Sequence, residues 1–299
     1  MLNQRAEFDR TEEDLGNIVE FGHVNVCIPD QRLATIFYVS GLGLTRDPYL
    51  VTGEDNMWIN VGREQFHLPT GAPQVVRGTT GIVVPHFATQ IERLERVRPL
   101  LGGTRFSFSQ GSDFIEATCP WGNRIRCHEP DVERYGNVGL GIAYVEIEAP
   151  KGSAPLIARF YEDMLGAKAG LGETKDGAFA WVVAGAQTRL HFQERDGDSV
   201  AFDGHHIQIS LNDFSQPHRR LMEAGLITEE SNQHQYRFVD IVDIDRNRPL
   251  LRLEHEVRSM RHPMFGRVLA NRDPDVSNLL YAPGHEIARQ TIRAVETLG

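Results

Sequence analysis

Two short segments, FYVSGLGL at residues 37–44 and FYEDMLGA at residues 160–167, contain the same signature: an aromatic pair followed by a helix end with Leu-Gly. Each follows a strand-like segment with alternating faces, FGHVNVCIPD from residue 21 and GIAYVEIEAP from residue 141. Each is followed by further strand-like pieces separated by turn residues, such as REQFHLP and TRLHFQER. The order strand, amphipathic helix, three strands therefore occurs at least twice.

Plainer copies of the same order begin near residues 81 (GIVVPHFA) and 204 (GHHIQISLND), so the repeat returns about every 60 residues. The sequence predicts an α+β fold of four βαβββ units. One such unit is a curved sheet whose concave face cannot be buried alone. Two units must pair to complete a cup, and four units make two cups.

The repeat also predicts the division of the chain. We expect an arm at 1–20, a first pair of units at 21–133, a second pair at 138–256 and a tail at 257–299. The segment RYGNVG (134–139) has the composition of a linker, and HEIARQTIRAVETL predicts a closing helix in the tail.

Composition excludes several classes of function. The 299 residues include 31 Lys and Arg against 41 Asp and Glu, a formal net charge of −10, which disfavours nucleic acid and anionic membranes as partners. The three cysteines have no CxxC spacing, and an odd, sparse set is typical of reduced thiols. The first residues lack the apolar stretch of a signal peptide, and the most apolar run, AFAWVVAGA, is too short to span a bilayer. We expect a cytoplasmic protein.

The four-unit pattern resembles the vicinal oxygen chelate superfamily, which includes glyoxalases, bleomycin-resistance proteins and extradiol dioxygenases. The resemblance implies a divalent metal held by residues on the first and last strands of the units, pointing into a cup. Alternation along the strands places the candidates on polar faces. His23 opposes Val24, His67 opposes Phe66 and Leu68, His206 opposes Ile207, and Glu254 opposes Leu253.

The way in which the units pair decides which candidates meet. Sequential pairing gives one cup with His23, His67 and Arg126, and another with His191, His206 and Glu254 beside Tyr144. Crossed pairing of the first unit with the fourth brings His23, His206 and Glu254 together with His67 nearby. Arg126, Tyr144 and His191 then share the second cup, which is too basic for a cation. We favour the crossed arrangement, because it yields a two-histidine, one-carboxylate triad with open positions on iron(II) or manganese(II).

This triad is similar to that of the extradiol ring-cleaving dioxygenases, especially the hydroquinone-cleaving branch. The resemblance implies His23, His206 and Glu254 as metal ligands, His67 as an acid–base histidine and Arg237 as a polar active-site residue. One position departs from the pattern: Ile244 stands where that branch has a tyrosine about ten residues before the glutamate. Tyr236 could replace it only in a different strand register.

The implied function is a dioxygenase that cleaves a small aromatic diol of catechol or hydroquinone type. Its metal would be iron(II) first, with manganese, zinc or nickel as alternatives. Three other functions stay open. The first is a glyoxalase-type lyase or isomerase acting on a dicarbonyl-derived substrate, which a fourth ligand such as His67 would favour. The second is a metal-free protein that binds a small aromatic molecule, and the third is a catalytically inactive scaffold whose cups serve subunit assembly. A homo-oligomer is compatible with each.

Overall fold

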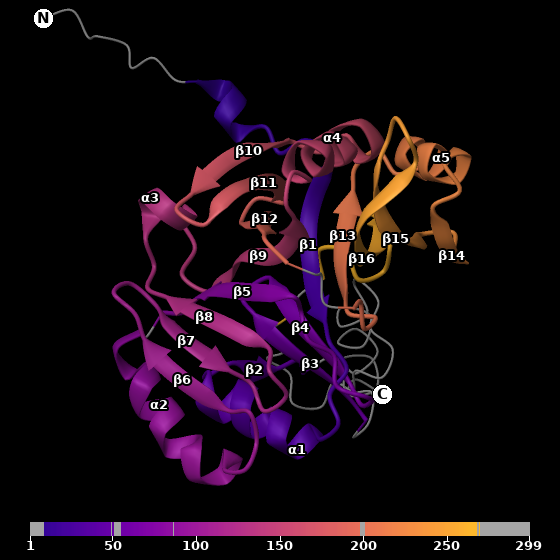
Figure 1. The fold of residues 1–299 in the computed structure, drawn as a ribbon. Coiled ribbons are helices and arrows are strands. Elements are labelled where there is room, and N and C mark those ends of the chain that lie inside the picture. The colour runs from indigo at the N-terminus through magenta and orange to yellow at the C-terminus, as the bar shows by residue number, and fades with distance from the viewer. Residues whose placement is uncertain are drawn as a thin grey trace, which may run out of the picture.

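The computed structural model describes residues 9–48, 50, 55–85, 87–197, 201–267 and 269. Within them the chain forms two eight-stranded mixed sheets with few helices, an α+β architecture (Figure 1). The predicted closing helix lies outside the described residues.

Four strand–helix–strand units follow one another along the chain, after a short 3-10 turn, η1 (Arg10–Glu13). The first contains β1 (Ile18–Asn25), α1 (Gln31–Ala34), the π-helical η2 (Thr35–Gly41), β2 (Thr45–Arg46), β3 (Asn56–Val61) and β4 (Glu64–Pro69). The second contains β5 (Gly78–Val83), η3 (Phe87–Thr89), α2 (Gln90–Val97), η4 (Arg98–Leu101), β6 (Ser107–Gln110), β7 (Ile115–Thr118) and β8 (Arg124–His128), and α3 (Val132–Tyr135) follows it. The third contains β9 (Gly141–Pro150), α4 (Ala154–Leu165), β10 (Ala169–Thr174), β11 (Gly177–Ala184) and β12 (Thr188–Arg195). The fourth contains β13 (His206–Leu211), α5 (Ser215–Glu223), β14 (Ile227–Asn232), β15 (Gln235–Asp243) and β16 (Arg248–Ser259).

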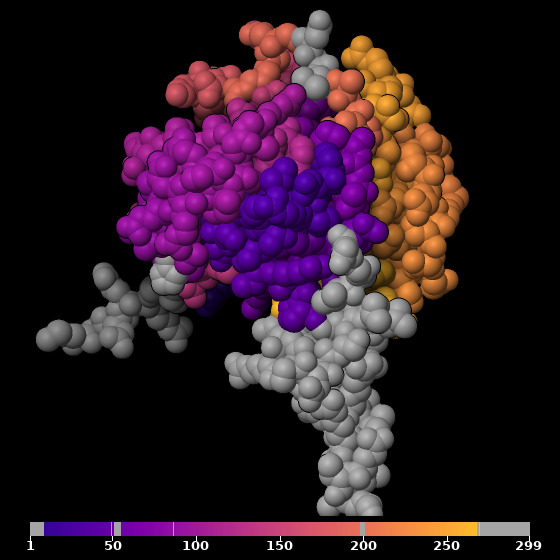
Figure 2. Space-filling model, turned by 90° about the horizontal axis from the view of Figure 1, so that it is seen from below, coloured from indigo at the N-terminus to yellow at the C-terminus, as the bar shows by residue number. Residues whose placement is uncertain are grey.

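The units pair in the crossed arrangement. One sheet has the order β14-β15-β16-β13-β1-β4-β3-β2, and the other has the order β10-β11-β12-β9-β5-β8-β7-β6. The first strands of paired units lie antiparallel, with Val24 opposite Ile207 in one sheet and Thr80 opposite Val145 in the other. The favoured pairing is thus confirmed, and each sheet takes one unit from each half of the sequence. Figure 2 shows the result on the surface, where the indigo and purple first unit adjoins the orange fourth unit.

The repeated aromatic pairs account for the sequence signature. Phe37 and Tyr38 are fully buried on the first helix, and Phe160 and Tyr161 are fully buried on α4. Both pairs belong to the continuous hydrophobic core under the sheets. α4 ends at Gly166, which adopts the left-handed conformation that glycine tolerates best (φ 68°). The Phe-Tyr…Leu-Gly pattern is therefore a packing requirement of each helix, since burial of large aromatic rings is a major source of stability.

The helices are short: none in the described part of the chain is both long and apolar enough to cross a membrane.

Candidate metal centre

Three histidines meet on one face of the sheet built by the first and fourth units. His206 lies on β13, His23 on the adjacent β1 and His67 on β4, the next strand across. In the strand register Asn25 stands between His206 and His67, and His23 is two residues along β1 from it. One ring nitrogen from each histidine lies within 4.8 Å of the others. Crossed pairing thus brings together residues that are far apart in the sequence.

The closest approach is between the Nε2 atoms of His23 and His206, which lie 3.3 Å apart. Two nitrogens that each bind one ion at 2.0–2.1 Å, at tetrahedral or octahedral angles, are roughly 3.0–3.4 Å apart. The pair is therefore spaced as two ligands of a single ion would be.

Burial keeps these imidazoles neutral. His23 is 1% exposed and His206 is 8% exposed. Burial lowers the pKa of both histidines well below the usual value, and the positive charges of Arg258 and Arg237 add to the effect. For the same reasons the pKa of His67 is lowered to about 3. A metal ligand must offer a nitrogen lone pair, so a neutral, buried imidazole is the form that binds.

His67 is fixed by two neighbours. Its ring stacks on the indole of Trp58, with centroids 3.8 Å apart and an interplanar angle of 13°. The Asn25 side-chain amide and His67 Nδ1 form a hydrogen bond of 2.7 Å. Nε2 is buried and has no hydrogen-bond partner among the described residues. A buried polar atom without a partner is costly, and a bound ion or substrate would satisfy it.

Two carboxylates complete the polar face. Glu254 is the register partner of His206 on β16, and its carboxylate pairs with the Arg237 guanidinium. Glu256 pairs with Arg237 and with Arg258, the latter at 2.6 Å, and its Oε2 lies 3.7 Å from His206 Nε2. Neutral imidazoles, an unpartnered nitrogen and adjacent carboxylates are together a donor set that fits a divalent transition-metal ion.

Comparison with known proteins adds to this geometry. No family model matches the sequence, and no curated protein matches it. Solved structures do match. A Bacillus subtilis protein provisionally described as a dioxygenase superposes with a TM-score of 0.58 at 16% identity, over 93% of this chain and 96% of its own. Glyoxalase I from Zea mays superposes with a TM-score of 0.56 at 12% identity, over 84% of this chain and 95% of its own.

The chain has the vicinal oxygen chelate fold. Identities this low establish the fold alone.

Within the vicinal oxygen chelate fold, the structure brings some of the predicted site residues together and separates others. His23, His67 and His206 converge, whereas Glu254 is beside His206 but bound to Arg237. Arg237 lies on the cup face of β15. Tyr236 lies on the opposite face of β15, fully buried against Phe214 and His218 near α5. Its ring belongs to the core, so Tyr236 does not take the place of the tyrosine that was expected at the position of Ile244.

Several residues near the histidines were not predicted from the sequence. Trp58 and Asn25 hold His67, and Glu256 and Arg258 border His206. Strand alternation could have identified three of them, because Asn25 shares a strand face with His23, and Glu256 and Arg258 share one with Glu254. Trp58 is the register partner of His67 on the neighbouring strand.

The second cup has different chemistry. The Tyr144 hydroxyl and His128 Nε2 are 3.0 Å apart, the Tyr144 and His191 rings stack at 5.6 Å, and Arg126 pairs with Glu116 at 2.8 Å. The Tyr144 ring lies directly over Gly81, where an added Cβ would come within 2.2 Å of it. Across the described residues, the histidines of the first cup are the one group of three spaced to share an ion.

Proposed function

We propose that this chain is a metal-dependent enzyme that opens the ring of a small aromatic diol, of the catechol or hydroquinone type, with dioxygen. The observation that carries the proposal is the 3.3 Å approach of His23 Nε2 and His206 Nε2 beside two carboxylates. Two histidines and one carboxylate leave positions on iron(II) or manganese(II) for other ligands.

Glu254 is the proposed carboxylate ligand. It stands directly opposite His206 across the β13–β16 pair and is held by one arginine, Arg237. Glu256 is held by two arginines, Arg237 and Arg258, which neutralise its charge. A carboxylate with one cationic partner is released to an ion at a lower cost than one with two.

A divalent ion bound here would supply a chelation point for two substrate oxygens and would acidify their hydroxyl groups. The protein supplies the rest. Trp58 holds the His67 ring in place by stacking, and His67 Nε2 is buried with no hydrogen-bond partner in the described part of the chain. That nitrogen can accept a proton from a hydroxyl and return it to the product, because a neighbouring substrate oxyanion raises the pKa of a histidine. Arg237 places positive charge where oxyanion charge would develop.

The overall reaction balances without an external reductant. One carbon–carbon bond of the ring breaks, both atoms of dioxygen enter the product, and the substrate supplies the electrons that reduce the dioxygen.

A second function is favoured by one specific observation. His67 lies within ligand distance of the other two histidines, and a third histidine ligand is suited to zinc or nickel and to a non-redox isomerase or lyase. The likeness in fold to maize glyoxalase I is compatible with that reading. A metal-free binding protein of the same fold is the third candidate.

The deciding experiment is oxygen uptake by anaerobically purified protein loaded with iron(II). Catechols and hydroquinones with different substituents are added singly, and oxygen consumption and a yellow ring-opened product are measured. His206→Ala protein loaded in the same way is the control. No uptake across the panel would reject the dioxygenase. Isomerisation of a glutathione–methylglyoxal adduct by the zinc or nickel form would then support the second function, and protein that retains no metal would support the third.

A further inference from the structure

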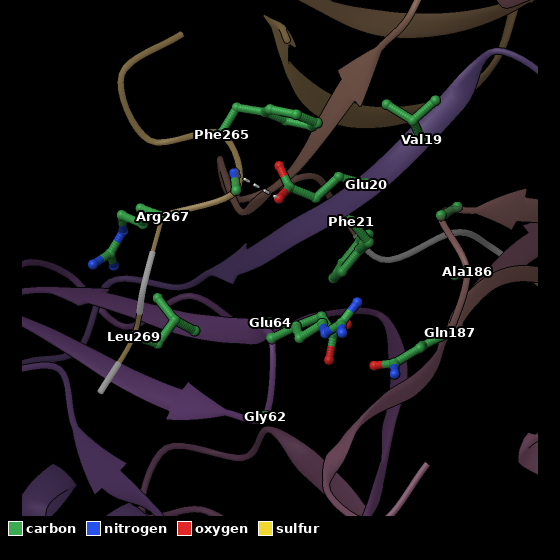
Figure 3. A pocket seen from close by; sticks show the side chains of 14 residues that line it. Val19, Glu20, Phe21, Gly62, Glu64, Ala186, Gln187, Phe265, Arg267 and Leu269 are labelled. Atoms are coloured by element: carbon green, nitrogen blue, oxygen red, sulfur yellow. Dashed lines mark hydrogen bonds between the residues drawn. The ribbon is translucent and has the colours of Figure 1, made fainter. Parts of the chain in front are cut away.

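A large hollow in the described part of the molecule lies outside the histidine cluster. It has a volume of about 630 Å³ and lies between the start of β1, the β3–β4 turn, the β11–β12 turn, Phe265–Arg267 and Leu269. Figure 3 shows Glu20, Phe21, Glu64, Gln187 and Phe265 arranged around this space. A volume of this size is typical of small-molecule sites.

Arg267 lines both this cavity and a smaller hollow beside the metal centre. Its guanidinium bonds Asp47 Oδ2 at 2.5 Å and Gln65 Oε1 at 2.9 Å. The smaller hollow, of about 30 Å³, shares Glu20, Arg63, Arg267 and Leu269 with the large cavity and reaches His23. None of the three histidines lines the large cavity, so a ligand bound within it would lie beside the metal centre without contacting them.

One side of the cavity carries negative charge. Glu64 is 5% exposed and its Oε2 accepts one hydrogen bond, from the backbone N–H of Ile142 at 3.0 Å. Glu20 accepts from the Ser210 hydroxyl at 2.9 Å and from the Gly266 N–H at 3.4 Å. Neither carboxylate forms an ion pair with a residue that the structure describes. Burial raises the pKa of Glu64 to about 7; the charge of Glu20 acts in the same direction, and the hydrogen bond from Ile142 and the charge of Arg63 oppose it. A cationic group entering the cavity would stabilise the ionised forms of both carboxylates.

The cavity also carries the opposite charge and an apolar wall. Arg63 lines it, is exposed, and has neither an ion pair nor a hydrogen bond to the described residues. Between the charged groups lie Val19, Phe21, Phe265 and Leu269. The Gln187 side-chain oxygen, also in the lining, is buried and lacks a hydrogen-bond donor within the described chain. Ammonium donors would satisfy this oxygen and the carboxylates, and a carboxylate would pair with Arg63.

We propose that this cavity binds a small zwitterion of the amino-acid type with an apolar side chain, its ammonium group between Glu20, Glu64 and Gln187 and its carboxylate on Arg63. The lining of this cavity contains none of the proposed metal ligands, and binding there does not depend on the reaction proposed at the metal centre.

The test uses L-leucine and L-phenylalanine as probes, titrated into the full chain at pH 8 and followed by calorimetry. Isopentylamine and 4-methylpentanoate are the matched compounds that lack the carboxylate or the amine. L-Leucine is expected to bind at least about tenfold more tightly than either, since each lacks one charge-assisted contact. Glu64→Gln and Arg63→Gln should each weaken L-leucine binding by about tenfold or more. His206→Ala in the metal centre and Arg126→Gln in the second cup should leave it unchanged.

Three results would overturn the proposal. They are the absence of saturable binding of both amino acids, equal affinity for isopentylamine or 4-methylpentanoate, and unchanged L-leucine affinity in both the Glu64 and Arg63 variants. Gln187→Leu, which keeps the volume and removes the buried oxygen, provides a second check should a charge variant fold poorly.

Discussion

His23 Nε2 and His206 Nε2 lie 3.3 Å apart although 183 residues separate them in the sequence. Both imidazoles are buried, and burial with nearby arginines keeps both neutral. We expect anaerobically prepared protein to hold about one divalent ion per chain, measured by elemental analysis. His23→Ala and His206→Ala should each weaken binding by about 100-fold or more. His191→Ala, in the second cup, is the control. Stoichiometric metal in the double variant would place the ion elsewhere.

The two glutamates of β16 provide a second prediction. Glu254→Gln should remove most of the metal, because it takes away a ligand charge beside His206. Glu256→Gln should retain more metal, because that carboxylate is already neutralised by Arg237 and Arg258. Metal content of the two variants, prepared in parallel, makes the comparison. The reverse order would assign the ligand role to Glu256, whose oxygen lies 3.7 Å from His206.

His67 can act as a proton carrier or as a third histidine ligand, and one substitution separates the roles. If His67 carries the proton, His67→Ala should slow turnover by about 10²–10⁴-fold while metal content stays unchanged. Loss of metal in the same variant would show that His67 is a ligand and would favour the isomerase or lyase. His128→Ala, a buried histidine of the other sheet, tests whether removal of any buried imidazole has the same effect.

Glu64 predicts a pH dependence of stability. Its pKa is raised by burial from 4.5 to about 7, so between these values the folded protein keeps a proton that the unfolded chain has released. The free energy of unfolding therefore falls as pH rises through this window, and above pH 7 the total decrease reaches about 3 kcal/mol. Glu64→Gln should be more stable than the parent protein at pH 8 and no more stable at pH 4, as measured by urea unfolding. Glu133→Gln, on an exposed side chain, should show no such difference. A Glu64→Gln protein less stable at pH 8 would contradict the prediction.

Gly81 predicts a packing effect in the second sheet. A methyl group there would meet the Tyr144 ring at 2.2 Å, and that ring is fixed by its contact with His128. Gly81→Ala should lower the free energy of unfolding by about 1–3 kcal/mol, as overpacked positions do. Gly139→Ala, where an added Cβ meets nothing within 4 Å, should have little effect. When Tyr144 is already replaced by alanine, Gly81→Ala should lower the free energy of unfolding by less than it does in the parent protein. An equal loss in both backgrounds would refute the clash with Tyr144 as the cause.

The fold could be predicted from the sequence because its signal is repeated. The Phe-Tyr…Leu-Gly pattern reports a helix that must bury two rings, and it occurs at Phe37 and again at Phe160. The polar faces of the strands were predictable for the same reason, since alternation has a fixed period of two. Crossed pairing could be inferred because it gathers the histidines in one cup.

The contacts of individual side chains were not predictable in this way. Glu254 and Glu256 share a strand face, so periodicity cannot say which of them Arg237 holds more firmly. Tyr236 and Arg237 are consecutive, and only the register of β15 against β16 decides which one faces the cup. The large cavity involves turns from both sheets, and no local pattern in the sequence relates Glu64 to Gln187.

Crossed pairing also governs when the first cup can form during synthesis. The second and third units are neighbours in the chain, and β5 and β9 can pair as soon as both have been made. β1 must wait for β13, which emerges some 180 residues later, so its edge stays open for most of translation. Closing so long a loop is slow, and open strand edges favour misassembly. We therefore expect a nascent chain released before residue 206 to be prone to aggregation, and the sheet nucleated by β5 and β9 to be the scaffold on which the two ends of the chain meet.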